Sequence, residues 1–89
     1  MILIKIRLMP SSPDTDLGKI KKEAEKAISK TENSSLYSSN EEPIAFGLKA
    51  LDMTVLWPDD KSPEELEQDL SSIEHVGSVE VLDVRRAIG

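Results

Sequence analysis

The hydrophobic residues of this chain recur with a period of two, then with a period of three to four, and this succession occurs twice. Every second residue from Ile2 to Leu8 is apolar, which is typical of a strand with one buried face. From Leu17 to about Lys30 the apolar residues follow helical spacing instead, with lysines and glutamates between them. Prolines and capping residues separate the two segments. The N-terminal part is therefore predicted to form a strand followed by a helix.

The strongest strand signal of the chain runs from Ile44 to Trp57. Its apolar residues change phase between Leu48 and Leu51, because the step between them is three residues. A β-bulge near Lys49 and Ala50 would bring both parts onto one face, so we expect such a bulge or a Phe46 end that faces away from the core. The polar segment before it, residues 31–43, has little to pack, and both a loop and a short edge strand are compatible with it.

A second helix and a last strand complete the order. Ser62 stands three residues before Glu65 and is followed by Pro63, which together form a capping-box signature for a helix that ends near Glu74 or His75. The segment 76–84 reads as the final strand. Its alternation predicts one face with Val79 and Val81 and the opposite face with Leu82 and Val84.

The order strand, helix, weak strand, long strand, helix, strand indicates the α+β class and a ferredoxin-like α/β sandwich. In this fold two helices cover one face of an antiparallel sheet, and the first strand lies between the long strand and the last one. With 89 residues the chain has room for one domain, expected to span residues 1–89.

Composition excludes several classes of function. There is no cysteine, so disulfides, thiolate metal sites and cysteine nucleophiles are excluded. Seventeen acidic against eleven basic residues give a net charge of −6, which would repel a phosphate backbone and argues against direct nucleic-acid binding. No segment approaches the ~20 apolar residues of a membrane span, and the N-terminus does not resemble a signal peptide. A cytoplasmic protein without membrane contact is expected.

No catalytic or metal-binding constellation can be assembled from the spacing. The single histidine, His75, falls at a predicted helix C-terminus, where a partial positive charge is favourable in its own right. Asp59 and Asp60 belong to a segment that reads as a turn and lacks the alternating ligands of a calcium loop. We therefore expect no cofactor, no metal ion and no enzymatic activity.

Two features of the expected surface remain. Phe46 and Gly47 follow Pro43 and combine a large apolar group with bare backbone, which suits close approach by a partner, although Phe46 is equally readable as a core side chain. Arg85 and Arg86 follow the last strand. They are placed to bind a carboxylate or phosphate of a partner, or to pair with neighbouring acids such as Asp83.

The segments "IKIRLMPSSPDTDL", "EEPIAFGLKAL" and "VGSVEVLDVRR" closely resemble the archaeal elongation factor 1-beta family, in order and with matching gaps. The family in turn resembles the C-terminal exchange domain of the eukaryotic factor. This resemblance implies a ferredoxin-like domain that promotes the replacement of GDP by GTP on elongation factor 1-alpha, the GTPase that delivers aminoacyl-tRNA to the ribosome.

The resemblance also implies which residues face the partner. Phe46 and its neighbours Pro43, Ile44 and Gly47 would belong to a rim that contacts the GTPase, and Arg85 and Arg86 would approach its nucleotide-binding domain. One departure is evident: eukaryotic members end in a tail whose lysine enters the magnesium region, whereas here a glycine falls near that place. A positive charge there would have to come from the two arginines.

A different function is compatible with the same fold. Small-molecule-sensing regulatory domains also use the ferredoxin-like sandwich and commonly pair edge to edge into dimers. That alternative predicts a ligand pocket and a stable dimer, whereas the exchange factor is expected to be a monomer when free.

Overall fold

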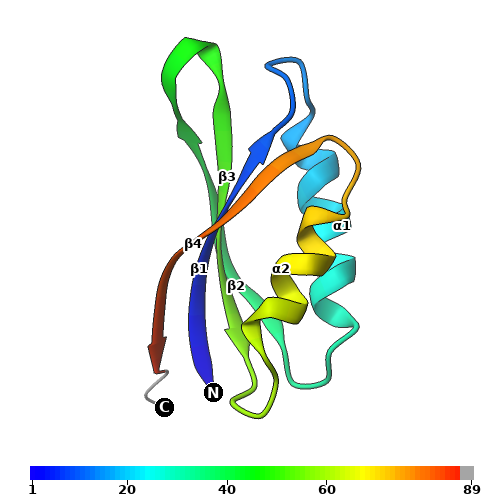
Figure 1. Cartoon of the computed structure of the whole chain (residues 1–89), viewed down its shortest axis with the longest axis vertical. Helices are drawn as coiled ribbons and strands as arrows, with labels where there is room; N and C mark the ends of the chain where they lie inside the picture. The colour runs from blue at the N-terminus through cyan, green and yellow to red at the C-terminus, as the bar shows by residue number, and fades with distance from the viewer. Residues whose placement is uncertain (87–89) are drawn as a thin grey trace.

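A computed structural model of the protein describes residues 1–86 and confirms the expected α+β sandwich (Figure 1). Four strands, two α-helices and one short 3-10 helix alternate along the chain. Their bounds are β1 Ile2–Pro10, α1 Leu17–Ser29, β2 Ser35–Pro43, η1 Ala45–Gly47, β3 Lys49–Trp57, α2 Pro63–Ser71 and β4 Val76–Arg86.

The four strands form one antiparallel sheet in the order β2-β3-β1-β4. The first strand therefore lies between β3 and β4, as the sequence predicts. Both helices lie on the same side of the sheet (Figure 1). No helix within residues 1–86 covers the opposite side, and we call it the open face.

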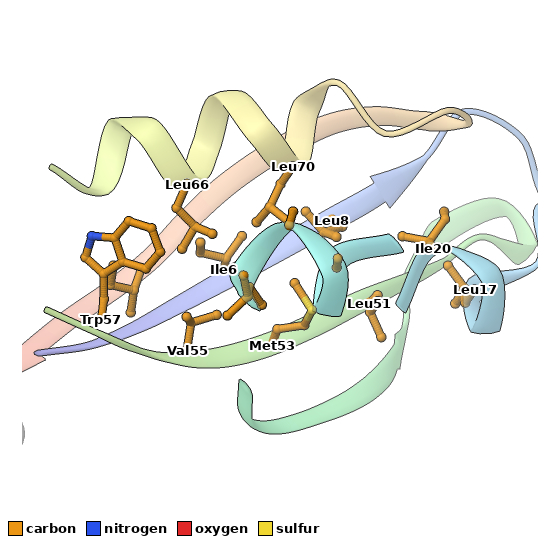
Figure 2. Close-up of a cluster of buried hydrophobic side chains, with 14 residues drawn as sticks. Ile6, Leu8, Leu17, Ile20, Leu51, Met53, Val55, Trp57, Leu66 and Leu70 are labelled. Atoms are coloured by element: carbon orange, nitrogen blue, oxygen red, sulfur yellow. The ribbon is translucent and has the colours of Figure 1, made fainter. Parts of the chain in front are cut away.

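The core lies between the helices and the inward side of the sheet (Figure 2). Alternate residues of β1 and β3 face the core from the sheet, and the apolar stripes of α1 and α2 cover it on the other side. Because successive side chains of a strand point to opposite faces, the residues between them face the open side. The labelled core residues are Ile6, Leu8, Leu17, Ile20, Leu51, Met53, Val55, Trp57, Leu66 and Leu70.

Both helices begin at the capping residues found in the sequence. Asp16 accepts a hydrogen bond from the Gly18 N–H at 2.9 Å, and Ser62 accepts one from the Glu64 N–H at 3.2 Å. The expected end of the second helix was wrong, because α2 ends at Ser71 and the chain then turns. His75 lies in that turn with a φ of 73°, not at a helix terminus.

The predicted strand Ile44–Trp57 was wrong in its first five residues. β3 begins only at Lys49, and the segment before it forms a turn around η1. The expected bulge is absent, because Lys49 and Ala50 pair in regular register with Pro43 and Glu42 of β2. The change of phase in the sequence marks the end of a turn, since residues 44–48 do not share the sheet's alternation.

The polar segment 31–43, for which the sequence was compatible with either a loop or a short edge strand, contains the full strand β2. β2 pairs with β3 along its length, although it carries only Leu36 and Tyr37 as large apolar residues. The register shifts between Leu36 and Ser38, so Tyr37 is the extra residue of a bulge. The pairing offered by the strongly apolar β3 gives this weak sequence its structure.

The last strand contains a bulge that changes the predicted faces. Ile6 pairs with Val81 but Lys5 pairs with Asp83, so Leu82 is the extra residue. Val84 is then opposite Ile4, on the helix side of the sheet. The prediction that Leu82 and Val84 share the face opposite Val81 was therefore wrong for Val84, because one inserted residue reverses the alternation.

Candidate partner-binding site

The turn between β2 and β3 is closed by its own backbone. The Ile44 N–H donates to the Leu48 carbonyl at 2.8 Å, and the Leu48 N–H donates to the Ala45 carbonyl at 3.3 Å. Between these bonds Phe46 and Gly47 both have positive φ, 62° and 75°. Glycine adopts this left-handed conformation freely, whereas a bulky side chain disfavours it. We call residues 43–48 the hairpin tip.

Phe46 points away from the protein. Its exposed fraction is 94%, higher than that of any other exposed large hydrophobic residue among residues 1–86. The interpretation of Phe46 as a core side chain is therefore wrong. Ile44 and Leu48 are half-buried and close the base of the tip, while Pro43 and Gly47 are exposed beside the ring. The tip presents one aromatic side chain on a turn fixed by two hydrogen bonds.

The two arginines lie on different sides of the sheet. Arg85 pairs with Leu3 and Arg86 with Ile2, so their side chains leave β4 toward opposite faces. Arg85 Nε lies 2.5 Å from Asp83 Oδ2, which is the acidic neighbour expected from the sequence. The pKa of Asp59 is held below its ordinary value by a hydrogen bond from the N-terminal ammonium group, and the nearby Arg86 charge lowers that pKa further.

The tip and the arginines occupy opposite ends of the sheet. At one end Leu8 pairs with Leu51, next to the hairpin tip, and at the other end Ile2 pairs with both Trp57 and Arg86. Figure 1 shows the β2–β3 hairpin at the top and the end of β4 at the bottom. The molecule is 38 Å long, so the two groups cannot line one pocket. A single partner contacts both only if it spans the domain.

The sequence analysis did not predict an ion pair that lies on the open face. Arg7 Nε lies 2.8 Å from Asp52 Oδ1, and Arg7 Nη2 lies 3.0 Å from Asp52 Oδ2. With an exposed fraction of 5%, Asp52 is the only buried polar or charged residue among residues 1–86, and the Arg7 side chain is 29% exposed. One signal pointed to it: Asp52 is the single charged residue between Ala50 and Trp57 in β3.

Carboxylates from three strands surround this guanidinium. The hydrogen bonds to Asp52 raise the pKa of Arg7, burial opposes this rise, and the charges of Asp52, Glu42 and Glu80 add smaller upward effects. These acids belong to β3, β2 and β4, while Arg7 belongs to β1. The direct contact of the pair joins β1 to β3.

The rest of the described chain offers no reactive constellation. Within residues 1–86 no three metal-binding side chains gather, and no helix is both long and apolar enough to cross a membrane. A groove of about 1400 Å³ beside α1 and the α2–β4 turn is open and lined by charges of both signs. His75 is exposed and its Nε2 lies 3.6 Å from Glu74 Oε1. The tail position that lacks the eukaryotic lysine lies outside the described residues.

The chain is an α+β sandwich that has an exposed aromatic side chain at one end of the sheet and two arginines at the other. Residues 3–87 match the profile of the EF-1 guanine nucleotide exchange domain family, and the chain belongs to this family. It is a guanine-nucleotide exchange factor for elongation factor 1-alpha in translation elongation.

Curated relatives agree over nearly the full chain. The elongation factor 1-beta of Methanothermobacter thermautotrophicus is 45% identical over 86 residues, which cover 96% of this chain and 94% of the relative. The elongation factor 1-beta of Methanosarcina barkeri is 39% identical over 87 residues, 96% of each chain. That of Thermofilum pendens is 33% identical over 90 residues, 99% of this chain and 97% of the relative.

Proposed function

We propose that the chain accelerates GDP release by binding alone, as a single exchange domain over residues 1–89 with no enzymatic activity of its own. A GTPase holds GDP mainly through backbone N–H groups around the β-phosphate and through Mg²⁺. A protein that displaces the metal or bends the phosphate loop therefore speeds release without a covalent step. No nucleophile or general base is required for this.

The energetic requirement is a difference in affinity. By linkage, the chain must bind the nucleotide-free GTPase more tightly than the GDP-bound form. A 10⁴-fold ratio between the two affinities corresponds to roughly 5.5 kcal/mol. An interface of the usual size, about 800 Å² per partner, can supply a difference of this order if it contains a few well-placed anchors.

Phe46 is the observation that carries this proposal. An aromatic ring that is 94% exposed, held in a left-handed backbone conformation, is unfavourable in the free protein both by hydration and by backbone strain. Contact with an apolar pocket of the GTPase would offset both terms. Pro43, Ile44 and Gly47 shape the turn that presents the ring, and we assign them to the same contact.

The second contact in this proposal is the arginine end. Arg85 and Arg86 supply positive charge near the end of β4, and we assign one of them to the nucleotide-binding domain of the GTPase. Since they leave the strand toward opposite faces, only one can enter a given site while the other lies at its margin. The domain would then hold its partner at both ends.

The remaining expectations concern location, oligomeric state and other partners. We propose a cytoplasmic monomer without membrane contact, and the net charge of −6 argues against direct binding to nucleic acid. The acidic field favours a protein partner over a phosphate backbone.

The experiment is stopped-flow release of fluorescent GDP from elongation factor 1-alpha, with and without the chain. The wild type is expected to raise the release rate, and Phe46→Ala to require a higher concentration for half-saturation by about tenfold, the effect of removing one strong anchor. Tyr37→Ala is the matched control, since it truncates another exposed aromatic, 71% exposed, away from the tip. Equal curves for Phe46→Ala and wild type would exclude the ring from the contact.

A further inference from the structure

The β2–β3 hairpin separates from β1 and β4 at one end of the sheet. The last residue of β3 that pairs with β1 is Leu51, opposite Leu8, whereas Lys49 and Ala50 pair with β2 only. Beyond Leu8, β1 pairs with β4 only. A hollow of about 310 Å³ lies where the strands separate, with Pro10 and Lys49 among its lining residues. The direction of the hairpin is thus not fixed by β1 beyond this point (Figure 1).

The Arg7–Asp52 ion pair lies one residue inside this fork. Arg7 and Asp52 are direct partners across β1 and β3, adjacent to the final pair Leu8–Leu51. Two nitrogens of the planar guanidinium, Nε and Nη2, each donate to a different carboxylate oxygen of Asp52, a geometry that fixes orientation as well as distance. The guanidinium also attracts Glu42, which belongs to the projecting part of β2. Arg7 therefore holds the β3 arm of the hairpin at its root through two hydrogen bonds.

Stability alone does not account for this pair. Burying a carboxylate is costly, and replacing a buried ion pair by apolar side chains of similar volume is often neutral or stabilising. The advantage of the charged pair is directional, because apolar side chains pack in many orientations and a two-point ion pair in few. A small change of angle at the root moves the far end of the hairpin by a larger distance.

We propose that Arg7, through its paired contact with Asp52, is a positioning residue that sets the direction of the projecting hairpin and thereby the place of Phe46 relative to the arginine end. This inference rests on the proposed role of Phe46. It assigns the open face a function in exchange without direct contact with the GTPase.

The test uses one double variant, in which Arg7→Met and Asp52→Leu are combined so that both charges are removed together. It is compared with the wild type. We expect the midpoint of urea unfolding to be unchanged or higher. The half-saturating concentration in GDP release from elongation factor 1-alpha is expected to rise by about tenfold, because a displaced anchor loses most of its contribution. If the double variant is as stable as the wild type and reaches half-saturation at the same concentration, the inference is wrong.

The matched control is Glu23→Leu with Lys26→Met. This change removes the ion pair of α1, with Lys26 Nζ 3.4 Å from Glu23 Oε1, and so deletes one acid and one base far from the fork. It is expected to leave half-saturation unchanged. If the control raises it as much as the double variant does, the effect is one of surface charge and the inference fails.

Arg7→Lys covers the case in which the double variant does not fold. Lysine keeps the charge and loses the two-point geometry. The half-saturating concentration of Arg7→Lys should therefore lie between that of the wild type and that of a chain lacking the ion pair. Amide hydrogen exchange then gives a reading that needs no GTPase. In Arg7→Lys the Ile44 and Leu48 amides, which close the tip, should exchange faster while the amides of Ile4 and Val55 do not change.

The two readings separate the possible failures. Unchanged tip protection in Arg7→Lys would overturn the positioning role whether or not the chain stimulates GDP release. Loosened tip amides together with a wild type that leaves GDP release unaltered would instead refute the proposed function and leave Arg7 as the residue that orders the hairpin.

Discussion

Phe46 occupies a backbone conformation that costs a bulky L-residue roughly 1 kcal/mol or more relative to glycine. Its neighbour Gly47 has the same left-handed φ at no such cost, and a Cβ at position 47 would meet no atom within 4 Å. Strain at the tip is therefore local to one residue. The sequence shows an aromatic next to a glycine, but not that the aromatic itself takes the positive φ, since apolar neighbours on both sides resemble a strand.

Replacing Phe46 with glycine is expected to stabilise the isolated protein. Relief of the left-handed strain should raise the free energy of unfolding by about 1 kcal/mol, measured from the urea midpoint, while exchange activity falls. Asn33→Gly is the comparison, because Asn33 has a φ of 68° and asparagine tolerates it, so the gain there should be only a few tenths of a kcal/mol. A lower midpoint for Phe46→Gly would show that the ring stabilises the fold.

At the scale of elements, the sequence predicted those helices and strands whose own apolar residues show which face is buried. β1, α1 and the start of α2 follow directly from apolar periodicity and capping residues. β2 could not be assigned, because a strand of serine, asparagine and glutamate is stabilised by its partner and not by its own side chains. The bulge at Leu82 was missed because it inserts one residue into a run that still looks alternating.

The candidate site was predicted in part for the same reason. Its residues could be named from their types, since an aromatic beside glycine and two arginines stand out in an acidic chain. Their orientation could not be, because it depends on where each strand begins and on the bulge in β4. Asp52 was not recognised, since only the register shows that it faces Arg7.

The helix layer is expected to be sensitive to single truncations. Leu66 is completely buried where α2 meets the sheet, so Leu66→Ala should lower the free energy of unfolding by roughly 2–5 kcal/mol through lost contacts and a cavity. For a domain with a total stability of ~5–15 kcal/mol this is a large fraction. Gln68→Ala, at an exposed position of the same helix, should change the urea midpoint little. Similar midpoints for both variants would contradict the assignment of α2 to the core.

At the scale of the whole molecule, the tip and the arginine end are separated by the length of the sheet. Residues this far apart with no shared contacts usually act independently. Phe46→Ala weakens binding at the tip, and the pair Arg85→Ala and Arg86→Ala weakens it at the arginine end. When all three changes are combined, the fold-reduction in affinity should therefore equal the product of these two fold-reductions. A combined loss no larger than one of them would mean that the two ends do not act on the same bound state.

The arginine variant also has a charge control. Lys21→Ala with Lys22→Ala on α1 removes the same two charges from another surface. If Arg85 and Arg86 act at close range, their loss should persist at high salt, whereas a long-range effect is screened within about 10 Å at 0.1 M salt. If the arginine variant and the lysine variant lose the same exchange activity, and both losses disappear at high salt, the arginines make no direct contact.

Trp57 is the only tryptophan of the sequence and lies completely enclosed at the end of β3, with Nε1 donating to the Lys61 carbonyl at 3.2 Å. It pairs with Ile2, at the arginine end and far from the tip. The protein therefore contains an intrinsic fluorophore whose emission follows the integrity of the interior but is insensitive to changes at residue 46. An altered exchange rate with an unaltered indole spectrum distinguishes a lost contact from a loosened fold without any added label.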